Sequence, residues 1–294
     1  IEKEKFKEVG IDLNILEEIK TSINIITKII TEDGKSSSSK TELIMIIGSI
    51  SGILIYIFIF MYGTMVMRGV IEEKTNRIIE VIISSIKPFQ LMMGKIIGVA
   101  MVGLTQFILW IILTMILLSV AELFFMDANS ITNGLNNQEK SLMITEITNL
   151  TNNINLIQIL FSFLFYFLAG YLLYSSLFAA VGSAVDAEAD TQQFILPVTI
   201  PLILAFILIQ PIMDNPDGNL SFWMSIIPFT SPIVMMVRLP FGVPIWEILL
   251  SMFILIITFI LTTWIAAKIY RVGILMYGKK ATYKELLKWI SYKA

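Results

Sequence analysis

The sequence predicts an all-α, polytopic membrane protein, on the basis of three observations. First, 56% of its 294 residues are hydrophobic, only 15% are charged, and the mean hydropathy is +0.81. Soluble domains usually carry about 25% charged residues. Second, five stretches are apolar over roughly the 20 residues that a helix needs to cross a bilayer. Third, these stretches lack the alternation of a β-barrel, and lipid cannot satisfy exposed backbone groups, so we expect helices.

The predicted spans cover residues 43–67, 91–118, 156–184, 191–213 and 248–267, within a transmembrane domain over 43–268. Lys and Arg concentrate in the loop after the first span and in the tail, 269–294. The positive-inside rule places both in the cytoplasm. Residues 1–42 are then expected to be the end of an extracytoplasmic domain and a joint into the membrane. An outside start implies one earlier span, so six are expected in the full protein.

Several kinds of chemistry are excluded by composition. The chain has no Cys and no His, which removes disulfides, thiolate metal sites, a serine–histidine triad and most zinc chemistry. It contains no Gly-x-x-x-x-Gly-Lys-Ser/Thr loop for binding phosphate. A net charge of −2 argues against a nucleic-acid partner. We therefore expect no catalytic, cofactor or metal site in this chain, and scarce charges within the spans argue against an ion-driven carrier.

The loop after the first span is the most informative segment. Over residues 69–86 a stripe of isoleucines at helical spacing faces one side, and charged residues take the other, which predicts an amphipathic helix in the cytoplasmic interface. Two interpretations stay open: a simple connector, or a docking helix that transmits force from a cytoplasmic partner. The apolar stripe is Ile71, Ile78, Ile82 and Ile86, and the candidate coupling residues are Glu72, Glu73, Lys74, Arg77 and Glu80.

The second cytoplasmic loop carries three carboxylates at alternate positions, Asp186, Glu188 and Asp190. They are expected either to interact favourably with the dipole of the next helix or to bind a cation or basic partner residues. Pro197 and Pro201 lie inside the fourth span, where each lacks a backbone donor. We therefore expect a bent or broken helix there.

Close helix packing is predicted by two pairs of glycines four residues apart, Gly48 with Gly52 and Gly94 with Gly98. The pattern is common in helical bundles and is weak evidence for dimerisation.

Four segments in order resemble the permease subunits of bacterial ABC exporters, specifically the sodium-efflux permease-like subgroup. The first is similar to the coupling-helix loop of that family, the second to its acidic loop, the third to its outer re-entrant segment, and the fourth to its last span and exit. They are Glu72–Lys74 with Asn76, Arg77, Glu80, Ser84, Pro88, Leu91, Gly94 and Lys95; Gly182, Asp186, Glu188, Asp190, Gln192 and Gln193; Pro228–Pro232 with Met235, Met236 and Arg238; and Pro244, Trp246, Glu247, Ala267, Ile269–Gly273 and Tyr277–Lys279.

The resemblance implies a permease in the bacterial cytoplasmic (inner) membrane that dimerises and binds two cytoplasmic ABC ATPase subunits. ATP and magnesium would be held by those ATPases, and the segment over 69–86 would pass their movement to the spans. The subgroup name implies sodium as substrate, whereas the scarcity of fixed charges in the spans fits a hydrophobic or amphipathic substrate equally well. The alternatives are a non-transporting membrane scaffold and an intramembrane enzyme.

Overall fold

The computed structural model describes residues 38–83, 85–125, 156–278 and 282–292, and within these ranges all regular structure is helical. The predicted extracytoplasmic segment, 1–42, lies almost entirely outside the described residues. The described residues from Ile44 onward form one compact unit. The elements are α3 (Ser38–Thr75), α4 (Ile78–Ile83), α5 (Pro88–Phe125), α8 (Leu156–Ala184), η1 (Glu188–Thr191), α9 (Gln192–Ile207), α10 (Ile209–Asp214), α11 (Asn219–Ile226), α12 (Ser231–Arg238), η2 (Leu239–Phe241), α13 (Ile245–Gly273) and α14 (Tyr283–Ser291).

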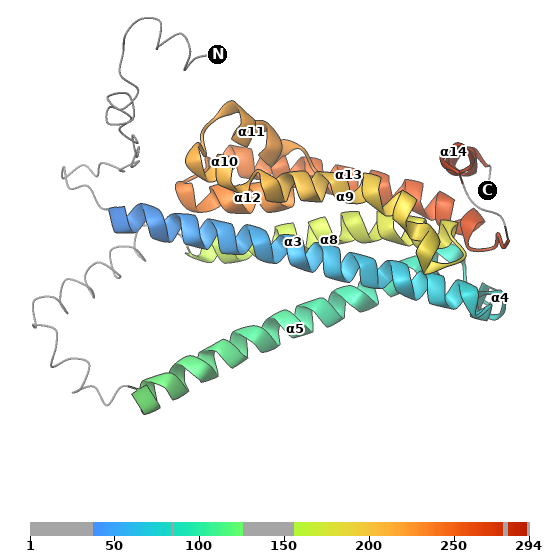
Figure 1. Cartoon of the computed structure of the whole chain (residues 1–294), viewed down its shortest axis with the longest axis horizontal. Helices are drawn as coiled ribbons and strands as arrows, with labels where there is room; N and C mark the ends of the chain where they lie inside the picture. Colours follow the sequence, from blue (N-terminus) through green and yellow to red (C-terminus); the bar gives the residue numbers. More distant parts are fainter. Residues whose placement is uncertain (1–37, 84, 126–155, 279–281, 293–294) are drawn as a thin grey trace, which may run out of the picture. The chain divides into compact units, whose positions relative to one another are not determined.

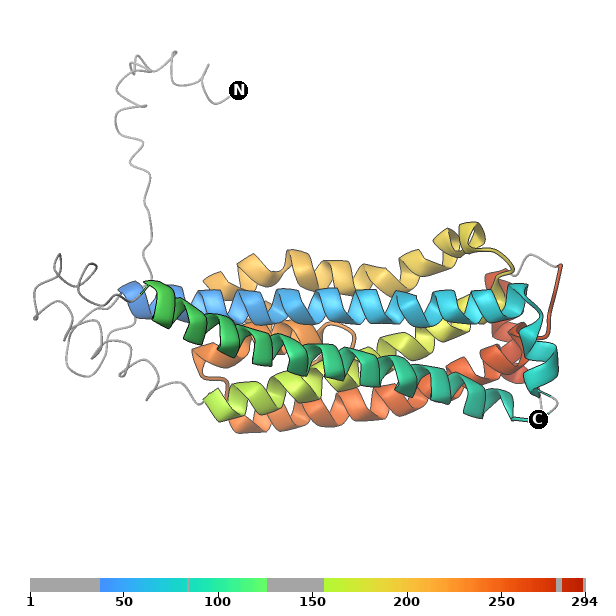
Figure 2. The ribbon, with the colours of Figure 1, turned by 90° about the horizontal axis from the view of Figure 1, so that it is seen from below.

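The prediction of five membrane-spanning helices is confirmed for the described part of the chain. Five helical stretches there are long and apolar enough to cross a membrane: Ile44–Thr75, Pro88–Leu117, Ile157–Ala184, Glu188–Asp214 and Ile245–Gly273. The short helices α4 and α14 lie at one end of this bundle, and α10, α11 and α12 lie towards the other (Figure 1). We call these the α4 end and the α11 end. Figure 2 shows the long helices side by side from below.

The core of the bundle is built around α8. Half of the α8 span is buried, whereas at most 28% of each other span is. The helix packs against α13, α12, α5 and α9. Its buried face is largely aromatic, with Tyr166, Phe167, Tyr171, Tyr174 and Phe178 all almost fully covered. Many apolar side chains of α5, in contrast, are exposed, which suits a helix that faces lipid.

Glycines allow three close helix contacts. A Cβ on Gly48 would lie 2.7 Å from the Val237 carbonyl oxygen of α12, so the first glycine pair packs within the chain. A Cβ on Gly182 of α8 would lie equally close to the Met67 carbonyl oxygen of α3, at 2.7 Å. Gly273 of α13 similarly meets Ser183. The second glycine pair, in α5, has no such neighbour within 4 Å.

The fourth span is broken, but later than the sequence predicts. Pro197 and Pro201 both lie inside the continuous helix α9, so the helix is not broken at these prolines, and a bend there stays a prediction. The interruption falls at Leu208, between α9 and α10. It places Pro211 in the first turn of α10, where a helix does not need the missing backbone donor.

A buried helix follows at the α11 end. Every residue of α12 is buried, against α8, α10 and α11, although the helix has only eight residues. The predicted re-entrant segment over Pro228–Pro232 therefore coincides with the turn from α11 into an internal helix. Gly242, at φ +93°, ends η2 in the left-handed region and turns the chain into α13.

Candidate coupling site at the α4 end

The loop predicted as one helix over 69–86 is two helices. The first span continues as α3 to Thr75, and the chain then turns at Arg77, whose φ of 56° is in the left-handed region. The Arg77 amide donates to the Lys74 carbonyl, and the Glu80 amide donates to the Arg77 carbonyl at the start of α4. Because left-handed backbone ends an α-helix, the register of the isoleucine stripe changes here. Ile71 and Ile79 are buried, whereas Ile78 and Ile86 are exposed.

This turn separates the five predicted coupling residues into two groups. Glu72, Arg77 and Glu80 are exposed, as expected for residues that contact a partner. Glu73 and Lys74 turn towards the protein instead, and the expectation that Glu73 faces outward is wrong. Both lie in the last turn of α3, where they pair with charged residues of other segments and do not join the exposed surface that includes α4.

Lys74 lies at the centre of the site. Its side chain is 2% exposed, and its ammonium lies 2.9 Å from an Asp186 carboxylate oxygen. The ammonium also donates to the Ser183 carbonyl at 2.8 Å and lies 5.9 Å from the centre of the Tyr277 ring. A buried ammonium is tolerated only with such partners, because removing a charge from water is costly. The end of α3 is therefore held against the end of α8.

Asp186 connects a third segment to this pair. Its second carboxylate oxygen accepts a hydrogen bond from the Gly278 amide at 2.7 Å, and its carbonyl accepts one from the Thr75 hydroxyl at 3.3 Å. Gly278 has a φ of +72°, a backbone conformation that suits glycine. One carboxylate thus joins the end of α3, the loop between α8 and α9, and the segment after α13.

Tyr277 completes the surroundings of Lys74. Partial burial and the nearby carboxylate of Glu80 raise the pKa of the Tyr277 phenol, against the opposite effect of Arg77. The phenol therefore stays neutral around pH 7. Its ring faces the ammonium at a distance suited to a weak cation–π contact.

Two further ion pairs involve α3. Glu73 lies 2.7 Å from the ammonium of Lys95 in α5, with both side chains largely covered. A Cβ on Gly69 would lie 3.4 Å from that ammonium, in ordinary van der Waals contact. Arg68 pairs with Glu188 at 2.9 Å, but both side chains are more than 60% exposed. Exposed pairs of this kind contribute little stability, so the Glu73 and Lys74 pairs are the structural ones.

Two of the three carboxylates of the acidic loop pair with basic residues within this chain, and the dipole interpretation stays a prediction. Glu188 and Asp190 lie in the first turn of η1, directly before α9. Asp186 and Glu188 each pair with a basic residue of α3. In the described ranges no three carboxylates gather closely enough to hold a metal ion.

Helix α14 is part of this end and was missed from the sequence, which suggested only a tail over 269–294. The Thr282 side chain accepts from the N3 backbone amide, and Glu285 accepts from the Thr282 amide, which is a capping box. The Tyr283 hydroxyl donates to the Gln193 carbonyl, and Trp289 is buried. The Thr-x-x-Glu spacing before an amphipathic stretch is the signal that predicts such a helix.

A second buried ion pair lies at the α11 end. Arg238 of α12 is 2% exposed and its guanidinium lies 2.9 Å from a carboxylate oxygen of Glu247 in α13. It also donates to the Pro216 carbonyl at 2.7 Å and to the Ser225 hydroxyl at 2.5 Å. Arg238 therefore joins α12 to α13, α11 and the segment before α11.

The fold and the α4-end contacts define an integral membrane protein whose connecting segments at one end are tied to several spans. Residues 4–268 match the model of the ABC-2 family transporter proteins, and the chain belongs to this family. It is therefore a multi-pass membrane subunit of the ABC permease class.

Two relatives are similar over most of the chain. The uncharacterized protein YhaP of Bacillus subtilis is 28% identical over 281 residues, which are 95% of this chain and 63% of the relative. The uncharacterized protein MJ1024 of Methanocaldococcus jannaschii is 26% identical over 241 residues, 82% of this chain and 52% of the relative. The chain thus spans a little over half the length of the curated relatives that it matches. No solved structure matches it significantly.

Proposed function

We propose that the chain is the permease subunit of an ATP-driven ABC exporter and that a separate cytoplasmic ATPase docks at the α4 end. The observation that carries the proposal is the contrast within five neighbouring residues of one segment. Glu72, Arg77 and Glu80 form an exposed charged surface. Glu73 and Lys74 lie between these exposed residues in the sequence. Glu73 is paired with Lys95, and Lys74 is paired with Asp186.

This contrast suits the transmission of movement. A displacement of α4 is transmitted directly to the last turn of α3, because only the turn at Arg77 separates the two helices. From there the Glu73 pair leads to α5, and the Lys74 pair leads to α8 and the segment after α13. Packed helices shift as units, so displacement of α4 is expected to move several spans together.

We propose that the protein lies in the bacterial inner membrane, with the α4 end on the cytoplasmic side. This orientation is supported by the distribution of Lys and Arg, since α14 and the segment around α4 carry several of these residues. The loop between α8 and α9, at the same end, is short. ATP and magnesium are assigned to the partner ATPase, because the sequence contains no phosphate-binding loop. A dimer of permeases is proposed from the resemblance to ABC exporters.

The substrate is proposed only by class. Among the charged residues of the described helices, Glu73 is paired with Lys95, and Arg238 of α12 is paired with Glu247. A path with few available charges favours a hydrophobic or amphipathic substrate, with sodium as the alternative.

Isolation of the tagged protein from native membranes tests this proposal. The expected result is co-purification of a subunit that carries an ABC nucleotide-binding domain, with magnesium-dependent ATPase activity in the complex. The partner-free protein in lipid should show no binding of ATP by calorimetry. A preparation without any ATPase subunit would favour the scaffold alternative, and saturable nucleotide binding by the chain alone would favour an enzyme.

A further inference from the structure

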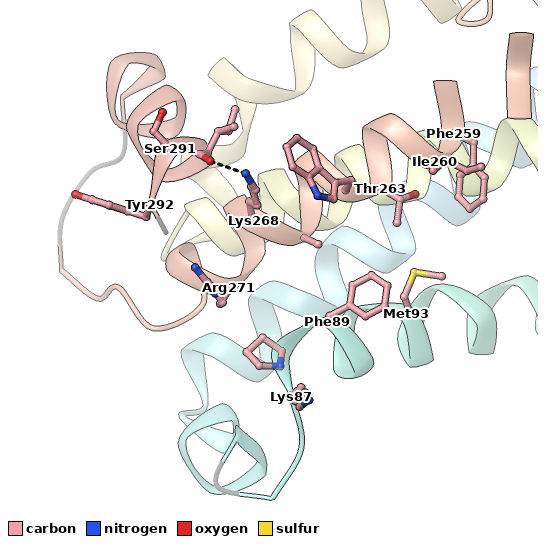
Figure 3. A pocket seen from close by; sticks show the side chains of 14 residues that line it. Lys87, Phe89, Met93, Phe259, Ile260, Thr263, Lys268, Arg271, Ser291 and Tyr292 are labelled. Atoms are coloured by element: carbon pink, nitrogen blue, oxygen red, sulfur yellow. Dashed lines mark hydrogen bonds between the residues drawn. The ribbon is translucent and has the colours of Figure 1, made fainter. Parts of the chain in front are cut away.

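Helix α14 is short, but it is held against the bundle at both of its ends. At its first turn, the Tyr283 hydroxyl donates to the Gln193 carbonyl, and the ring centres of Tyr283 and Phe194 lie 5.1 Å apart in an edge-to-face contact. At its last turn, the Lys268 ammonium donates to the Ile290 carbonyl at 3.1 Å (Figure 3). Isolated helices of this length are unstable in water, so these contacts help to keep α14 folded.

The contacts connect α14 to two of the spans. Gln193 and Phe194 belong to the first turn of α9, and Lys268 lies near the end of α13. The end of α14 also borders a groove of about 1000 Å³, with the beginning of α5 on its other side. Figure 3 shows Phe89 on the α5 side of this groove and Tyr292 at the α14 side. Because packed helices shift as units, a displacement of α14 is expected to move α9 and α13.

The apolar side chains of α14 face the protein. Trp289 is 5% exposed and belongs to the buried core, and Leu286 packs against that core. A helix that lies in the membrane interface turns such residues into lipid instead. The opposite face of α14 is therefore the one open to a partner.

This outward face is basic. Lys284 and Lys288 lie about one turn apart on it, and Leu287, next to Lys288, is 67% exposed. The acidic residue of the helix, Glu285, is half-buried, and its carboxylate accepts from the Thr282 amide in the capping box. The outward face of α14 thus combines two ammonium groups with one apolar side chain.

The segment around α4 presents the opposite charge. Its exposed charged residues are Glu72, Arg77 and Glu80, two carboxylates and one guanidinium, whereas α14 exposes the ammonium groups of Lys284 and Lys288. Both helices lie at the α4 end (Figure 1). A partner that contacts both surfaces would be oriented by the change of sign, because the reversed arrangement would bring like charges together.

We propose that the outward face of α14, formed by Lys284, Leu287 and Lys288, is a second contact for the cytoplasmic ATPase and meets an acidic surface of that subunit. The inference rests on the proposed function, because it uses the same partner. It assigns that partner a second path into the bundle: α4 acts on α3, and α14 acts on α9 and α13. Anionic lipid headgroups are the competing occupant of the two lysines, and the experiment separates them from the ATPase.

Binding of the purified ATPase subunit to the protein in nanodiscs of phosphatidylcholine tests the inference, because this lipid has no net charge. Lys284→Gln with Lys288→Gln should raise the dissociation constant about fivefold, since exposed ion pairs are individually weak. Lys284→Arg with Lys288→Arg keeps both charges and is the matched control, which should bind like the parent protein. Both positions are exposed, so the melting temperatures of both variants should match that of the parent protein.

A cross-link in the otherwise unchanged chain locates the contact. A photoreactive benzoylphenylalanine in place of Leu287 should form a covalent link to the ATPase subunit in the purified complex. The control is the same group in place of Ile245, which is 69% exposed at the start of α13 and should give no link.

The outcomes distinguish this inference from the proposed function. Unchanged binding by Lys284→Gln with Lys288→Gln, together with weaker binding by Glu72→Arg with Glu80→Arg, would overturn the inference and leave the proposed function standing. A loss of stimulated ATPase activity only in vesicles of anionic lipid would assign the two lysines to headgroups and would also overturn it. If no ATPase subunit co-purifies with the parent protein, the proposed function fails and this inference fails with it.

Discussion

The ammonium of Lys74 and the carboxylate of Asp186 are 2.9 Å apart, in a pair that links the end of the first described span to the loop between α8 and α9. The lysine side chain is almost fully buried, and that of Asp186 is about one third exposed. Its neighbour Glu188 also pairs with α3, but in solvent. The two carboxylates are two residues apart in sequence, but their ion pairs are therefore expected to contribute differently to the stability of the protein.

Asp186→Asn is expected to destabilise the protein by about 2 kcal/mol, which corresponds to roughly 5 °C in melting temperature. The variant leaves Lys74 buried with its carbonyl contact but without its counter-charge, and the partial exposure of Asp186 reduces the cost below that of a fully buried pair. Glu188→Gln is the control and should cost less than about 1 kcal/mol. Thermal unfolding followed by circular dichroism checks both. Equal shifts in the two variants would contradict the assignment.

The Arg238–Glu247 pair gives a prediction about charge burial. Arg238→Met alone leaves the carboxylate of Glu247 buried without its partner, and we expect a loss of about 3–5 kcal/mol. Arg238→Met combined with Glu247→Leu should be more stable than the single variant, because no uncompensated charge remains. Melting temperatures of the single and double variants decide the point. A double variant that is less stable than the single one would contradict the expectation that the unpaired carboxylate of Glu247 is costly.

Glycine packing gives a matched comparison between two helices. Gly182→Ala should destabilise the protein, because the added Cβ would lie 2.7 Å from the Met67 carbonyl and backbone must move. Gly98→Ala in α5 meets nothing within 4 Å and should be neutral or stabilising by up to about 1 kcal/mol. Yield of monodisperse protein and melting temperature measure both effects. The reverse order would contradict the contact between α3 and α8.

The orientation is testable because the chain has no cysteine of its own. Single cysteines at Asn76 and Lys284 should react with a membrane-impermeant maleimide only after cells are permeabilised. A cysteine at Asp217, near α11, should react in intact cells. Labelling of the first two in intact cells would reverse the proposed topology.

The spans were predictable because bilayer thickness imposes a length and composition on each helix, which the described helices match. The break at Arg77 was not predictable from the sequence, since no Gly or Pro marks it and the isoleucine stripe fits one helix. The prolines at 197 and 201 suggested a bend or a break, and the interruption of the helix lies at Leu208 instead. The ion pairs of Lys74 with Asp186 and of Lys95 with Glu73 depend on how segments distant in sequence meet, which no local pattern specifies. Helix α14, in contrast, carried a capping signal in the sequence.

The central claim, that the exposed face of the α4 end receives the movement of an ATPase, is tested most directly by ATP hydrolysis in the reconstituted complex. Glu72→Arg with Glu80→Arg reverses two exposed charges on this face, and Asp214→Arg with Asp217→Arg makes the same change in charge at exposed positions of the α11 end. Both variants should insert and melt like the parent protein. We predict that the first loses at least about tenfold in permease-stimulated ATPase activity, equivalent to ~1.4 kcal/mol of coupling, and that the second retains it. Full stimulation by the Glu72→Arg, Glu80→Arg variant would contradict the claim and leave α4 as a connector.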